Sequence, residues 1–131
     1  MPLKLSLKPG EAVVVNGAVI RNGERRGTLL LETKARILRE RDVMFADQVK
    51  TPADAAYFAI MQMYLTGDRQ GPVYDTSIAA LADMMADMKD EDGRSAVLSI
   101  TRAVAAGQTY RALGAFRKLG RAESAGGAHD S

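Results

Sequence analysis

Residues 16–27 read NGAVIRNGERRG, with a short apolar run between two Asn-Gly pairs and three arginines close to the second pair. Asn-Gly readily accepts the positive φ angles of a two-residue hairpin turn, so the stretch predicts tight turns at 16–17 and 22–23. Arginine keeps its charge at physiological pH and offers a planar fork of donors that matches phosphate or carboxylate. This ribbon therefore favours anion binding, although arginines that only solvate a β-domain would give the same pattern.

Segments typical of strands flank this stretch. Residues 3–8 read LKLSLK, an alternation that predicts leucines on one face of a strand and lysines on the other. Further strands are expected at 12–15, 18–22 and 28–32. Residues 35–43 fit either a last strand or a short helical turn. The N-terminal part is therefore predicted to be an antiparallel β-meander of four or five strands.

From Thr51 onward the apolar residues recur every three to four positions. Thr51 followed by Pro52 is a typical helix start, because Thr caps the first turn and Pro needs no hydrogen-bond partner there. Helices are expected at about 51–65, 75–92, 95–106 and 108–119. The sequence thus predicts the α+β class, with an N-terminal antiparallel β-meander followed by a C-terminal bundle of about four short helices.

The predicted organisation has three parts. They are a basic antiparallel β-region over 1–50, a helical region over 51–122 that packs with it, and a disordered tail over 123–131. The net charge of +2 is divided unevenly, as +4 over 1–50, −6 over 51–92 and +4 over 93–131. Two basic surfaces separated by an acidic one suit either contact with a polyanion or self-association between unlike faces.

Missing residue types exclude several classes of chemistry. The chain has no cysteine, and its only histidine, His129, lies in the predicted tail, so thiol chemistry, histidine triads and His/Cys metal sites are not expected. The acidic run over 83–92 lacks the spacing of a calcium loop. No apolar run is long enough to span a bilayer. We therefore expect a non-enzymatic cytoplasmic protein that needs no metal or cofactor and does not contact a membrane.

Apolar residues on the predicted helices have two interpretations. Methionines and aromatics at helical spacing usually fill a core, but flexible thioethers also line grooves that hold a partner's helix. The candidate partner-binding residues are Tyr57, Met61, Tyr64, Met85, Leu113 and Phe116.

Three segments of the chain resemble the FlbT family, bacterial regulators of flagellin synthesis. They are LSLKPGE at 5–11 with VVVNGAVIRNG at 13–23, then residues 29–40, and finally YFAIMQMYL at 57–65. The resemblance is close from residue 5 to about residue 65 and looser over 78–119.

The resemblance implies a repressor that acts post-transcriptionally, at the 5′ untranslated region of flagellin messenger RNA, and promotes decay of that message. It also implies a second small flagellar protein, FlaF, as a partner. The alternative is an adaptor or chaperone-like module that holds FlaF or flagellin and affects the message indirectly. In a third reading the chain is a structural subunit whose unlike faces meet in a homo-oligomer.

The family supplies no binding residues to transfer, so the RNA contacts are inferred from the residue pattern. Phe45 is the only aromatic residue of the basic part, so a sheet that stacks bases is not expected, and contacts to backbone and base edges are. The candidate RNA-binding residues are Arg21, Asn22, Arg25, Arg26, Lys34, Arg36, Arg39 and Arg41.

Overall fold

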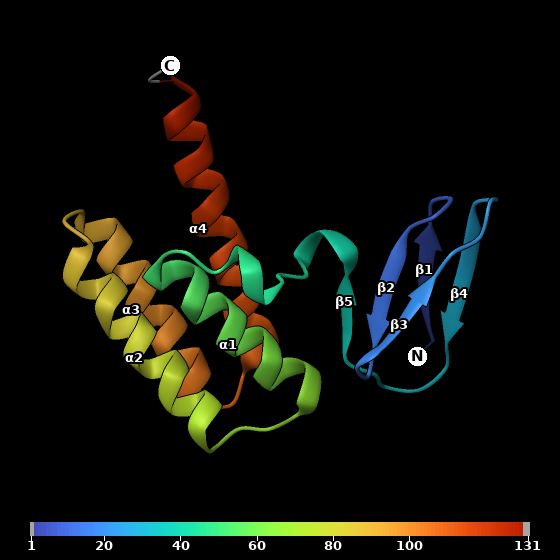
Figure 1. The fold of residues 1–131 in the computed structure, drawn as a ribbon, viewed down its shortest axis with the longest axis horizontal. Coiled ribbons are helices and arrows are strands. Elements are labelled where there is room, and N and C mark those ends of the chain that lie inside the picture. Colours follow the sequence, from blue (N-terminus) through green and yellow to red (C-terminus); the bar gives the residue numbers. More distant parts are fainter. Residues whose placement is uncertain (1, 130–131) are drawn as a thin grey trace. The chain divides into compact units, whose positions relative to one another are not determined.

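The structure is a computed structural model that describes residues 2–129, with side chains described for residues 2–119 (Figure 1). The chain divides into two compact units, Met1–Val43 and Met44–Ser131, here called the β unit and the helical unit. The sequence places the end of the β-region at residue 50, whereas residues 44–50 belong to the helical unit. One physical reason is visible at Met44, whose backbone N–H donates to Sδ of Met61 at 3.3 Å.

The β unit contains five strands: β1 (Leu3–Leu7), β2 (Ala12–Val15), β3 (Ala18–Arg21), β4 (Gly27–Leu31) and β5 (Ile37–Arg39). A short 3-10 turn, η1 (Glu40–Asp42), follows them. The strands form two antiparallel sheets, one with the order β1-β4 and one with the order β3-β2-β5. The predicted α+β class, with antiparallel strands before four helices, is confirmed. Only β2 and β3 pair as chain neighbours, because β1 pairs with the distant β4 (Figure 1).

The core of the β unit is small and aliphatic. Leu5, Leu7 and Val13 are buried, and half-buried side chains from both sheets pack against them: Val15, Leu29, Leu31 and Ile37. The alternation predicted for residues 3–8 thus places Leu5 and Leu7 on the core side, whereas Leu3, at the start of β1, is 48% exposed. Full burial of each such side chain contributes about 1.5–3 kcal/mol to the stability of the folded state. The free energy that this cluster contributes to folding is therefore small.

The two Asn-Gly pairs behave differently. Asn16 and Gly17 have φ angles of 51° and 85° and form the predicted turn between β2 and β3. The second predicted turn is wrong, because Gly23 does not have a positive φ and the strands on either side belong to different sheets. The side chain of Asn22 instead bonds to neighbouring carbonyls, and this fixes the segment as a loop.

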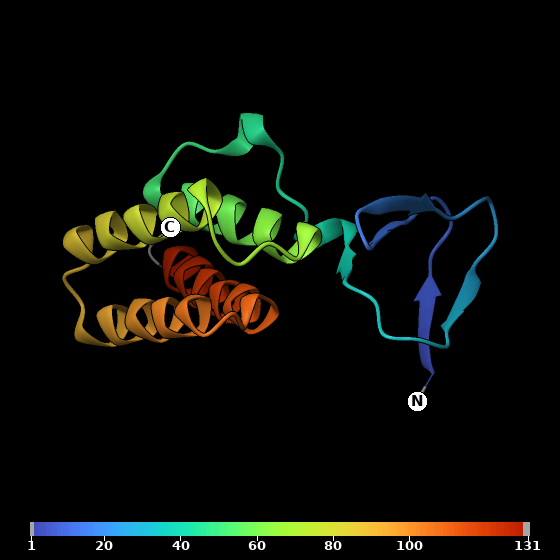
Figure 2. The same ribbon diagram turned by 90° about the horizontal axis from the view of Figure 1, so that it is seen from below.

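The helical unit begins with a 3-10 turn, η2 (Ala46–Gln48), and continues with four helices: α1 (Pro52–Thr66), α2 (Pro72–Asp87), α3 (Glu91–Ala105) and α4 (Thr109–His129). The predicted cap is confirmed, because Oγ1 of Thr51 accepts from the N–H of Asp54 at 3.1 Å. Figure 2 shows α1 and α2 in one layer and α3 and α4 in the other. Ile60, Leu81, Ile100 and Leu113, one from each helix, are fully buried between them.

Helices α2 and α3 begin earlier than the sequence predicts. Gly71, expected among the residues that end the first helix, is the N-cap of α2 and has a φ of 102°. The carboxylate of Asp90 accepts from the N–H of Gly93 at 3.1 Å, so Asp90 caps α3 and Gly93 lies inside that helix. The cap from Asp90 therefore outweighs the helix-breaking tendency of Gly93.

Helix α4 continues past Gly120, the predicted terminus, to His129. The predicted disordered tail, 123–131, lies outside the residues whose side chains are described, and it stays a prediction. Among the helices of the described part, none is long and apolar enough to cross a membrane.

Replacing Gly17 with valine should lower the free energy of unfolding of the β unit by about 1–3 kcal/mol, because a β-branched residue resists a φ of 85°. Gly23→Ala is the control. That position has an ordinary φ and open space around a new Cβ, so the change should be neutral or slightly stabilising. Urea unfolding of both variants measures the difference. Equal losses would mean that both pairs form tight turns after all.

Candidate nucleic-acid interface

Several of the predicted RNA-binding side chains are already used by the fold. Nη1 of Arg21 donates to the carbonyl of Gly10 at 2.6 Å, and its Nη2 lies 3.4 Å from Oε1 of Glu40. The other oxygen of Glu40 accepts from the N–H of Ala12 at 3.1 Å. Arg21 thus connects the end of β3 with the first turn of the β unit and with η1. A ligand would have to compete with these partners for its guanidinium group.

Asn22 is committed to the fold even more fully. Its Nδ2 donates to the carbonyls of Leu7, Lys8 and Arg25 at 3.1, 2.9 and 2.9 Å, and its Oδ1 accepts from the N–H of Gly23 at 2.9 Å. The amide therefore has no donor left to read a base edge. Asn22 therefore has a structural role in this loop, and its contact with RNA stays a prediction.

Arg39 and Arg41 also have partners within the β unit. Nη1 of Arg39 donates to the carbonyl of Ser6 at 2.9 Å and lies 3.7 Å from the carboxylate of Glu11. Nε of Arg41 lies 4.0 Å from the carboxylate of Asp42, with the arginine side chain 78% exposed. The exposed Arg41 pair adds little stability and leaves most of the guanidinium in water. Arg39 is held more firmly, because a hydrogen bond to a backbone carbonyl fixes it.

The remaining predicted cations lie at two opposite ends of the β unit (Figure 1). Arg25 and Arg26 lie in the loop between β3 and β4, and Lys34 and Arg36 lie in the loop between β4 and β5. Arg36 adjoins the hairpin turn, because its N–H donates to Oδ1 of Asn16 at 2.8 Å. In the described part of the chain, no hydrogen bond or ion pair holds the side chains of Arg25, Arg26 or Lys34.

Lys8 is a cation that the sequence argument missed. Leu7 and Gly27 form the last pair between β1 and β4, so Lys8 and Arg26 each lie next to that pair in the chain. Asn22 bonds to the carbonyls of both Lys8 and Arg25, so these two backbones lie close together. We call Lys8, Arg25 and Arg26 the cationic corner. Only the pairing of β1 with β4 brings Lys8 there, and no local pattern could have indicated it.

The cationic corner offers a ligand three positively charged side chains. All three side chains are on exposed residues and project from backbone that strand pairing and the Asn22 amide hold in place. Glu24 is the one acidic residue of the 22–26 loop, so the loop keeps a positive balance. Such an arrangement can bind successive phosphates of a nucleic acid, with two planar guanidinium groups for bidentate contacts.

The predicted partner-binding residues divide into core and surface. Met61, Leu113 and Phe116 are 5%, 0% and 7% exposed, so they pack the helical core and the first two offer a partner almost no surface. Tyr57 contacts Phe116 edge-on, with ring centroids 5.8 Å apart. Met85 is half-buried on α2. Most of these residues therefore pack the helical core, which is the first of the two interpretations that the sequence offers.

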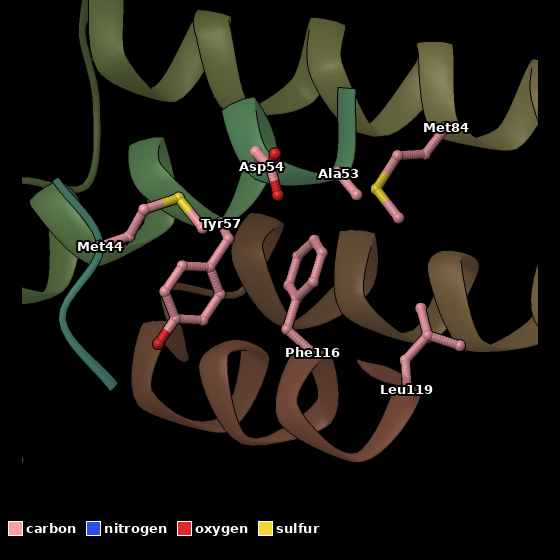
Figure 3. A pocket seen from close by; sticks show the side chains of 7 residues that line it. All are labelled: Met44, Ala53, Asp54, Tyr57, Met84, Phe116 and Leu119. Atoms are coloured by element: carbon pink, nitrogen blue, oxygen red, sulfur yellow. The ribbon is translucent and has the colours of Figure 1, made fainter. Parts of the chain in front are cut away.

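One pocket opens on the helical unit beside these residues (Figure 3). Its volume is about 250 Å³ and its lining is mostly apolar: Met44, Ala53, Asp54, Tyr57, Met84, Phe116 and Leu119. This is smaller than the pockets that hold drug-sized ligands, and it suits an apolar side chain or two from another protein. Asp54 is its one carboxylate, and Oδ2 of Asp54 accepts from the N–H of Lys50 at 3.1 Å.

In the part of the chain that the structure describes, no three histidine, aspartate or glutamate side chains gather closely enough to hold a metal ion.

Comparisons with known proteins relate the whole chain to one group. The family model described as "Flagellar protein FlbT" matches residues 3–125. A relative from Caulobacter sp. strain K31, named "Probable flagellum biosynthesis repressor protein FlbT", is 44% identical over 91% of this chain and 91% of its own length.

Two further relatives have similar names. The "Flagellum biosynthesis repressor protein FlbT" of Caulobacter vibrioides is 45% identical over 91% of this chain and 84% of its own. A probable repressor of the same name from Rhodopseudomonas palustris is 32% identical over 91% of this chain and 92% of its own. No solved structure matches the chain. The match extends beyond the strands, where the sequence resemblance is closest, and includes the helices.

Replacing Asn22 with aspartate should destabilise the β unit by about 1–3 kcal/mol, because a carboxylate cannot donate to the three carbonyls that the amide now satisfies. The double change Arg25→Ala and Arg26→Ala is the control and should leave the unfolding midpoint nearly unchanged. Urea unfolding followed by circular dichroism makes the comparison. An Asn22→Asp protein as stable as the unmodified one would show that the amide contributes nothing to the fold.

Proposed function

The chain belongs to the FlbT family of flagellar proteins, and we propose that it represses flagellum biosynthesis by binding flagellin messenger RNA. Relatives of up to 45% identity that match 91% of this chain carry the name flagellum biosynthesis repressor, and this supports the repressor role. The RNA-binding step is supported by one observation above the others. The cationic corner carries positive side chains that the fold positions but does not neutralise.

In this proposal the corner binds phosphates, and phosphate contacts supply most of the affinity. Lysine and arginine that neutralise phosphates release counterions, so the affinity of such a site falls steeply as salt rises. Lys34 and Arg36, at the opposite end of the β unit, would extend the contact along the RNA strand. Arg21, Arg39 and Arg41 would contribute to the positive field and less to direct contacts, because each has a partner in the fold.

The proposed target is the 5′ untranslated region of the flagellin message, and the proposed result is faster decay of that message. The protein would act as a binder and not as a nuclease. In this proposal another protein cleaves the message. Binding alone can expose a leader to degradation or prevent its translation.

The first experiment is binding of the purified protein to a labelled flagellin leader RNA and to a scrambled RNA of equal length, across a salt series. We expect preference for the leader and a steep loss of affinity with salt. Binding that ignores sequence would reduce the proposal to general affinity for polyanions. Absence of binding to either RNA would overturn it.

The double variant Arg25→Ala, Arg26→Ala should weaken leader binding and lower the slope of log affinity against log salt by about 1.4, because two phosphate contacts are lost. Lys50→Ala with Lys89→Ala is the matched control. It removes the same charge from exposed positions of the helical unit and should leave the slope unchanged. If the two pairs lower the slope equally, only net charge matters and the cationic corner is not the site.

A second candidate function rests on the pocket of the helical unit. This pocket has a volume of about 250 Å³ and a mostly apolar lining, so it would accept apolar side chains of a protein partner. We propose a FlaF-type flagellar protein as that partner, with flagellin as the other candidate. In this version the chain is an adaptor or chaperone-like module, and its effect on the message is indirect. Self-association through unlike charged faces is a related proposal, and it would appear as a concentration-dependent mass in solution.

Replacing Met44 with aspartate adds a second carboxylate to the residues that line the pocket, and it should weaken binding of a FlaF-type partner at least tenfold. Leu98→Asp is the control, because Leu98 is 42% exposed on α3 and is not among the pocket residues. Calorimetric titration of purified partner into each variant makes the measurement. Equal affinities would remove the pocket from the partner-binding surface.

A further inference from the structure

We propose that Tyr110 of the helical unit stacks on an unpaired base of a single-stranded RNA. The inference rests on the proposed RNA-binding function and assigns it a second contact, in the other unit of the chain. Single-stranded RNA is held by two kinds of group, namely cations that bind its phosphates and flat side chains on which its bases stack. The cationic corner supplies only the first kind, because no aromatic residue lies in the β unit.

Exposed aromatic rings are scarce in this chain. It has four tyrosines, three phenylalanines and no tryptophan. Among the described residues, Phe45 and Tyr110 are the large aromatics that remain exposed, at 63% and 53%. A tyrosine that exposes half of its surface loses apolar burial, so a ligand that covers the ring would recover it.

The Tyr110 ring is held in place before any ligand binds. It lies at the start of α4 and contacts Tyr64, at the end of α1, with ring centroids 5.3 Å apart and planes tilted by 41°. The guanidinium of Arg117, two turns further along α4, lies over the Tyr110 ring at 5.7 Å from its centroid. A fixed ring costs less entropy to use than a mobile one. The guanidinium plane on the ring is itself a surface on which bases stack.

Further arginines lie in the same part of the helical unit as this ring. Arg111 follows Tyr110 and is exposed, and residues 109–119 contain no aspartate or glutamate. The side chain of Arg69, from the loop between α1 and α2, lies against the backbone of Gly107. A Cβ built there would be only 3.1 Å from Nη1 of Arg69. Three arginines from two segments thus lie on or near the aromatic pair and could bind the phosphates that flank a stacked base.

The setting distinguishes Tyr110 from Phe45. Phe45 precedes η2, whose first turn contains Asp47, and no arginine or lysine lies between residues 42 and 49. An acidic peptide would need the arginines but not the exposed ring, whereas a nucleobase with its phosphates uses both. The combination of ring and cations therefore favours single-stranded RNA as the ligand, and it makes Phe45 the natural control.

The test compares a short oligoadenylate with an abasic strand that carries the same number of phosphates. We expect the unmodified protein to bind oligoadenylate about tenfold more tightly, because stacking adds to the phosphate contacts. Tyr110→Leu should remove this gap while affinity for the abasic strand stays unchanged. Tyr110→Phe should keep the gap, which separates loss of the ring from loss of the fold. Phe45→Leu should also keep it.

Other outcomes would overturn the stacking site, its assignment to Tyr110, its preference for RNA or the proposed function. Equal affinity of the unmodified protein for both strands, with salt-dependent leader binding intact, would overturn the stacking site and leave the proposed function standing. A gap that survives Tyr110→Leu would place stacking elsewhere and overturn the assignment. Displacement of oligoadenylate by polyglutamate of equal charge, as efficiently as by RNA, would show that the site binds acidic chains in general. Failure to bind the leader RNA at all would overturn the proposed function itself.

Discussion

The side-chain amide of Asn22 is the interaction on which the β unit depends. The unit consists of two small sheets that share no strand pair, and one small aliphatic cluster, Leu5, Leu7 and Val13, joins them. From the end of β3 in one sheet, Asn22 donates to the carbonyls of Leu7 and Lys8 at the end of β1 in the other. Arg39 makes a similar bridge from β5 to Ser6. Where apolar burial is small, such satisfied polar bridges decide how the sheets pack.

This use of polar side chains by the fold determines which charges remain for a ligand. Arg21 and Arg39 bond to backbone carbonyls and face carboxylates, so much of their hydrogen-bonding capacity is already used. Arg25 and Arg26 project from a loop whose backbone Asn22 fixes, and their side chains are left to water. A count of arginines therefore overstates the binding surface. The positions of the carbonyls and carboxylates select the part of it that can bind phosphate.

The helical unit divides its apolar residues in the same way. Most of the methionine and leucine side chains of the helical unit are buried between α1, α2, α3 and α4, and Leu113 is completely buried. Two of the apolar features that remain at the surface are a small pocket beside Tyr57 and an exposed tyrosine in contact with an arginine. These two features have different chemistry. The pocket suits apolar side chains, and the cation-flanked ring suits a base with its phosphates.

The sequence alone was enough for the features that depend on near neighbours. Asn16-Gly17 specified its turn, Thr51-Pro52 specified the start of α1, and the change of apolar period predicted the α+β class. The resemblance to the FlbT family rested on the segments at 5–23, 29–40 and 57–65, and the family model matches residues 3–125. From the sequence, both Asn-Gly pairs were predicted to form turns, and the arginines were predicted to form one binding surface. Tertiary structure separated them, because the roles of Asn22, Lys8 and Tyr110 depend on which distant carbonyls, strands and rings the fold brings within contact distance. Residue type sets what a side chain can bind, but only packing determines which partners it meets first.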